Sequence, residues 1–60
     1  MLEHEQGLHV LKTSNGVAVN LVVGNKTFRL AEFEKADDAV SFALSINENN
    51  PDCPIRVHWD

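Results

Sequence analysis

Apolar and polar residues alternate along the first half of the chain, and two short polar turns interrupt the alternation. It runs through Gly7–Thr13, Val17–Val23 and Lys26–Phe33, and a period of two is that of a β-strand with one buried face. The dipeptides Asn15-Gly16 and Gly24-Asn25 separate these segments, and both residue types tolerate the positive φ of a two-residue hairpin turn. This half of the chain therefore predicts a three-stranded antiparallel meander.

The two predicted turns determine which side chains share a face of the sheet, because directly paired residues point the same way. With two-residue loops, Leu21 lies opposite both Val10 and Phe28. The predicted core face collects Leu8, Val10, Val17, Val19, Leu21, Val23, Phe28 and Leu30, with Lys12, Ser14, Lys26 and Glu32 at its margins. The opposite face, which we call the outer face, collects His9, Leu11, Thr13, Ala18, Asn20, Val22, Thr27, Arg29, Ala31 and, at its end, Phe33.

The pattern becomes helical from Lys35 to about Asn47. Apolar residues recur there at spacings of three and four: Ala36, Ala39, Val40, Ala43 and Ile46. This spacing predicts one amphipathic helix. Asp37 and Asp38 fall in its first turn, where the helix dipole favours negative charge, and Pro51 prevents its continuation.

A fourth strand is predicted over Ile55–Trp59, where alternation returns. A helix that joins two strands of one sheet makes them parallel, but the strand can lie beside either Gly7–Thr13 or Lys26–Phe33. The predicted fold class is α+β, a two-layer βββαβ arrangement with the helix on one face of the sheet. We expect residues 7–60 to form a single domain and residues 1–6 a flexible N-terminal tail.

The closing segment CPIRVHWD contains the only cysteine of the chain and one of its three histidines. Strand alternation directs Arg56 and His58 to the outer face and Cys53 to the core face. Since the two side chains diverge, Cys53 and His58 match neither a shared metal site nor a thiol with its imidazole base. We expect no enzymatic activity, no catalytic residue, no metal ligand and no cofactor.

The composition limits which cellular compartment and which classes of partner we expect. The chain has 60 residues, a formal charge of −4 and one cysteine, so an internal disulfide is excluded and a reducing compartment is favoured. The sequence has no apolar run of about 18 residues that would span a membrane, and its first residues are acidic and polar, unlike a signal peptide. We therefore predict a cytoplasmic protein without membrane contact, whose negative charge disfavours nucleic acid as a partner.

The outer face is the predicted binding surface. Its candidate residues are His9, Leu11, Asn20, Val22, Arg29, Arg56 and His58. In the predicted register Leu11, Asn20 and Arg29 form one row across the strands, and His9, Val22 and Thr27 form the next. A chain this short gains little net stability from its core, which favours a second layer supplied by another molecule.

These observations predict a small non-enzymatic protein-binding module, such as an inhibitor or accessory subunit. It would bind a partner protein or a second copy of itself, as a homodimer, through the outer face or an edge strand. Two alternatives stay open. One is an ordinary solvated sheet face; the other is nucleic-acid binding through His9, Arg29, Arg56 and His58, although this face has only Phe33 on which a base can stack.

Overall fold

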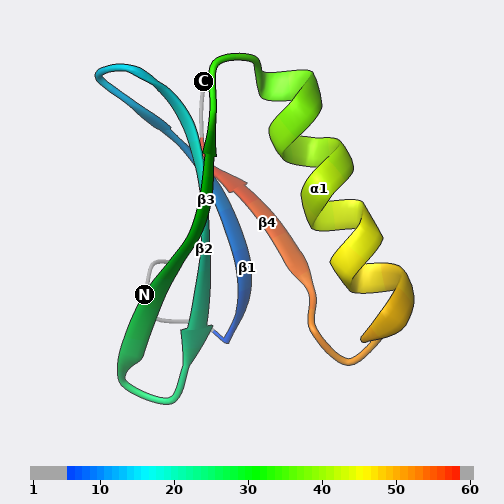
Figure 1. Cartoon of the computed structure of the whole chain (residues 1–60). Helices are drawn as coiled ribbons and strands as arrows, with labels where there is room; N and C mark the ends of the chain where they lie inside the picture. Colours follow the sequence, from blue (N-terminus) through cyan, green and yellow to red (C-terminus); the bar gives the residue numbers. More distant parts are fainter. Residues whose placement is uncertain (1–5, 59–60) are drawn as a thin grey trace.

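In the part of the chain that the structure describes, four strands form one sheet, and a single helix packs on one of its faces (Figure 1). The computed structural model describes residues 6–58. Its elements are β1 (Gly7–Thr13), β2 (Gly16–Val23), β3 (Lys26–Phe33), α1 (Ala36–Asn49) and β4 (Ile55–His58). The predicted α+β class and βββαβ order are confirmed. Residues 1–5 of the tail predicted over residues 1–6, and Trp59 of the predicted fourth strand, lie outside the described residues.

The strand order is β3-β2-β1-β4, with β4 parallel to β1. Of the two positions left open for the last strand, the structure therefore has the one beside β1. The backbone N–H of Leu8 donates to the Pro54 carbonyl oxygen at 2.8 Å, where the two strands begin. Gly7, with a φ of +134°, permits this approach because a Cβ there would lie 2.5 Å from the same oxygen.

The core lies between α1 and the two central strands. Leu8, Val10 and Val19 are fully buried and pack with Ala39 and Ala43 of the helix. The two alanines let the helix approach the sheet closely. Among the described residues, no helix is long and apolar enough to cross a membrane.

The helix covers less of the predicted core face than its apolar pattern suggested. Val23 is 51% exposed and Phe28 is 49% exposed. Both residues lie near the turn between β2 and β3, which points away from α1 (Figure 1). The prediction that these two residues are buried is therefore wrong, because the helix leaves that end of the sheet uncovered.

The hairpin between β1 and β2 turns one residue earlier than predicted. Thr13 pairs with Gly16, so the turn is Ser14-Asn15, and Val10 pairs with Val19. Gly16 is the first residue of β2, and the position requires glycine because a Cβ there would collide with the Phe33 carbonyl oxygen. The partners of β1 shift by two residues, and a shift of two leaves every side chain on its predicted face.

A β-bulge in β3 changes the predicted faces. Asn20 pairs with Arg29, but the next pair along the strands is Val19 with Ala31, so Leu30 is the extra residue. An extra residue reverses the alternation beyond it. The placements predicted for Leu30 in the core and for Ala31 on the outer face are therefore wrong.

The bulge directs Phe33 toward the helix and Glu32 to the outer face, again opposite to the prediction. The Phe33 ring packs against Phe42 of α1, with ring centroids 5.5 Å apart. Leu30 is 40% exposed. Burying the larger aromatic ring against another ring removes more apolar surface from water than burying Leu30 would, which explains why the bulge is favourable.

Candidate functional site

One row of polar side chains crosses the outer face on all four strands. Its members, in order from β4 to β3, are Arg56, His9, Asn20 and Arg29. The next row consists of His58, Leu11, Ala18 and Glu32. The corrected register of β1 thus places His9, and not Leu11, beside Asn20. Val22 lies one row further along and pairs with Gly7 and Thr27.

His9 and His58 form a direct contact between β1 and β4. His9 Nδ1 lies 2.6 Å from His58 Nε2, and the ring planes are within 5° of parallel, with centroids 4.8 Å apart. Rings stacked face to face keep their atoms about 3.5 Å apart, so these rings lie edge to edge in nearly the same plane. The contact is an N–H···N hydrogen bond, in which one nitrogen donates and the other accepts.

The two imidazoles differ in exposure and in support. His9 is 3% exposed and sits on β1, which has a strand on each side. His58 is half-buried and belongs to the four-residue edge strand β4. His9 is therefore the fixed member of the pair, and His58 is the member that can move.

Arg29 supports the polar row from β3. Its Nε–H donates to Asn20 Oδ1 at 2.6 Å, and its Nη1–H donates to Glu32 Oε2 at 3.0 Å. The Arg29 and Glu32 side chains are 44% and 60% exposed, so their ion pair adds little stability. Its effect is on orientation: the bulge brings the two side chains to one face, and Arg29 then holds the oxygen end of Asn20.

A hollow of about 270 Å³ opens on this face and is lined by His9, Leu11, Asn20 and His58. All four are among the seven candidate residues from the sequence. Arg29 and Arg56 occupy the two ends of the row that passes through it. The seventh candidate, Val22, is buried and lies outside the lining. The hollow therefore offers one apolar side chain among three that form hydrogen bonds.

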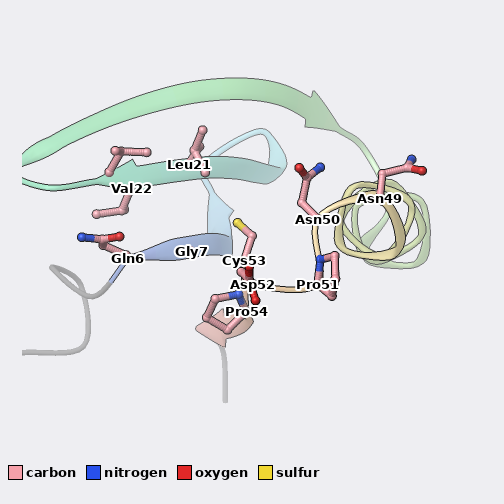
Figure 2. Close-up of a pocket in the computed structure, with 11 residues that line it drawn as sticks. Gln6, Gly7, Leu21, Val22, Asn49, Asn50, Pro51, Asp52, Cys53 and Pro54 are labelled. Atoms are coloured by element: carbon pink, nitrogen blue, oxygen red, sulfur yellow. The ribbon is translucent and has the colours of Figure 1, made fainter.

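A larger hollow of about 370 Å³ lies between the C-terminal end of α1, the end of β2 and the loop before β4 (Figure 2). Cys53 lines it, packs against the core and is half-buried. His58 lies on the outer face, so the predicted divergence of these two side chains is confirmed. Of the described residues that line this hollow, Asp52 and Cys53 are the titratable ones, and the thiol has no imidazole there to act as its base.

The contact between His9 and His58 was not predicted from the sequence. Alternation placed both residues on the outer face, but the sequence did not decide whether β4 lies beside β1 or β3. Only the first arrangement brings the two rings together. Within residues 6–58 no three His, Cys, Asp or Glu side chains gather as a metal-binding group.

Comparison of the chain with models of known protein families, with curated proteins and with solved structures finds no match.

Proposed function

We propose that the chain is a small non-enzymatic protein-binding module that docks a partner protein through the outer sheet face. The observation that carries this proposal is the hollow lined by His9, Leu11, Asn20 and His58, on the face opposite to α1. An apolar side chain framed by groups that form hydrogen bonds is a common arrangement at protein interfaces. An accessory subunit or inhibitor is the kind of protein we expect.

The small core supports the same proposal. A chain of 60 residues gains little net stability from a single hydrophobic layer, so a second layer from a partner would add stability. A second copy of the chain can supply that layer and form a homodimer. The edge strand β3, with Phe28 and Leu30 exposed, is a second route for docking, by strand addition. We further propose a cytoplasmic location, because a reducing compartment suits the free thiol of Cys53.

The proposal is tested by placing a charge in the hollow. Leu11→Glu should abolish association while the monomer stays folded, because a carboxylate cannot be buried in an apolar contact without a large desolvation cost. Leu44→Glu is the matched control, since Leu44 is 50% exposed on the helix and a charge there should leave association intact.

Association is measured in two ways: by sedimentation and native mass spectrometry of the purified chain, and by quantitative capture from the native lysate with each variant. A partner retained by the wild type and by Leu44→Glu, but lost with Leu11→Glu, is the expected result. Equal sedimentation and equal capture for all three proteins would disprove docking through the outer face.

Nucleic-acid binding is the second candidate, favoured by one observation: both arginines of the outer face lie in the same row. The bulge counts against it. Phe33 was the aromatic residue expected on this face, and it packs against Phe42 on the other side of the sheet. Single-stranded RNA should therefore give no gel shift even at low salt, and a salt-sensitive shift would favour this candidate instead.

A further inference from the structure

Charge is distributed unevenly between the two sides of the sheet. On the outer face, Arg29 and Arg56 accompany the two imidazoles, and Glu32 is already paired with Arg29. The helix, on the opposite side of the sheet, carries exposed carboxylates at Asp37, Asp38 and Glu48. Within the described residues, the polar rows of the outer face thus hold two guanidinium groups and one carboxylate, on a chain whose formal charge is −4. Two guanidinium groups beside the hollow disfavour a metal cation and favour an anion.

The histidine pair has an unused capacity for one proton. While both imidazoles are neutral, one N–H fills the 2.6 Å gap between His9 Nδ1 and His58 Nε2. A second proton would direct two N–H donors at the same point, which disrupts this hydrogen bond. Two convergent N–H donors, one of them charged, suit the two oxygens of a carboxylate.

We propose that the His9–His58 pair is a carboxylate-binding site that takes up one proton when an acidic side chain of a partner protein enters the hollow. This inference rests on the proposed function and adds the chemistry of the partner. Leu11 would contact the aliphatic stem of the Asp or Glu. Asn20 has Nδ2 left to donate, because Arg29 holds its Oδ1.

The site must open to accept the oxygen atoms. Charge-assisted N–H···O bonds measure about 2.7–2.9 Å, so an oxygen between the two nitrogens requires them to separate by roughly 2 Å. His58, half-buried on the short edge strand, is placed to make this movement, while His9 stays buried on β1. Binding therefore exchanges the histidine–histidine hydrogen bond for two bonds to the ligand.

The groups around the pair couple carboxylate binding to proton uptake. Arg56 on β4 lies directly opposite His9; β3 contributes Arg29 with its partner Glu32, and β2 contributes the uncharged Asn20. A carboxylate bound in the hollow adds a negative charge beside the pair and so favours its protonated form. By linkage, acid then strengthens carboxylate binding to the same extent as the carboxylate promotes protonation.

Fluorescence anisotropy of a fluorescein-labelled decaglutamate peptide with the full chain tests the proposal. If binding takes up one proton, Kd should fall about tenfold for each pH unit of acidification for as long as the free protein does not hold that proton. Calorimetry in two buffers of different ionisation enthalpy should give about one proton taken up per bound peptide.

His58→Gln is the key variant, because glutamine keeps a hydrogen-bonding side chain but cannot take up the proton. It should bind more weakly and take up less than one proton per bound peptide, because only His9 can then be protonated, while far-UV circular dichroism shows that it remains folded. Lys26→Gln removes a positive charge from an exposed position at the start of β3 and should preserve the full proton linkage.

Three results would overturn the inference. The first is peptide binding that is absent, takes up no proton, or is unchanged in His58→Gln. The second is tighter binding of a ten-nucleotide oligothymidylate than of decaglutamate, which would assign the surface to nucleic acid. The third is sodium acetate alone producing the same proton uptake, which would assign the site to a free carboxylate. Partner capture that depends on Leu11 but is independent of pH would overturn this inference and leave the proposed function intact.

Discussion

The β-bulge in β3 can be tested by comparing two alanine substitutions, Phe33→Ala and Leu30→Ala. The structure places Phe33 against the helix and leaves Leu30 40% exposed. A strand without the bulge would place Leu30 in the core and Phe33 on the outer face. With the bulge, Phe33→Ala should lower the free energy of unfolding more than Leu30→Ala does. Without the bulge, the order should be reversed.

The magnitudes follow from burial. Truncating a fully buried phenylalanine to alanine costs about 3–5 kcal/mol. Phe33 is partly buried, so we expect Phe33→Ala to cost about 2–3 kcal/mol, including the loss of its ring contact with Phe42. Leu30 lies outside the core cluster, and Leu30→Ala should cost less than about 1 kcal/mol. A single core in a chain of this length supplies only about 3–5 kcal/mol, so the first substitution removes about 40% or more of the free energy of unfolding.

Urea unfolding followed by far-UV circular dichroism measures both costs. With a slope of about 1 kcal/mol per molar urea, expected for a very small protein, Phe33→Ala should lower the midpoint by roughly 2–3 M or leave the chain unfolded. Leu30→Ala should lower it by less than about 1 M. If Leu30→Ala proves as costly as Phe33→Ala, or costlier, the bulge and the faces derived from it are wrong.

Two further predictions concern the beginning of β4. Gly7→Ala should destabilise the chain by about 1–3 kcal/mol in urea unfolding, because the residue has a positive φ and the new Cβ would press on the Pro54 carbonyl oxygen. The control is Gly24→Asn, at a turn position with open space around it. It should change the free energy of unfolding by no more than about 0.5 kcal/mol. Asn47→Ala removes the 2.8 Å hydrogen bond from Asn47 Nδ2 to the Cys53 carbonyl oxygen, which holds the loop before β4. It should lower the free energy of unfolding by about 1–2 kcal/mol and speed amide hydrogen exchange in that loop. Asn49→Ala, at an exposed position, should have neither effect. Equal effects of the two glycine substitutions would contradict the close contact of Gly7 with Pro54. Equal effects of the two asparagine substitutions would contradict the hydrogen bond from Asn47 to Cys53.

Most of the secondary structure could be predicted from the sequence, because it follows from local periodicity. The predicted bounds of β1 and β3 match the structure, and α1 begins one residue and ends two residues later than predicted. The faces of β1 and β2 were also right, although the turn between them was misplaced. The error shifted the register by two residues, which is a whole period of the strand.

Two features of the candidate site depended on contacts between distant residues. β4 lies beside β1, and Gly7 permits the close approach of the Pro54 carbonyl oxygen where the two strands begin. The bulge follows from the packing of Phe33 on Phe42, and it brings Glu32 to the side of Arg29. No local pattern in the sequence predicts either contact.

The sequence by itself thus determined which residues belong to the outer face on β1, β2 and β4, since alternation within a strand is a property of the backbone. Only the tertiary structure decided which of them meet. His9 and His58 are far apart along the chain and share a hydrogen bond because β4 lies beside β1. The arrangement of strands is set by the packing of the whole core. That packing brings two of the candidate residues, His9 and His58, into contact in the lining of the hollow.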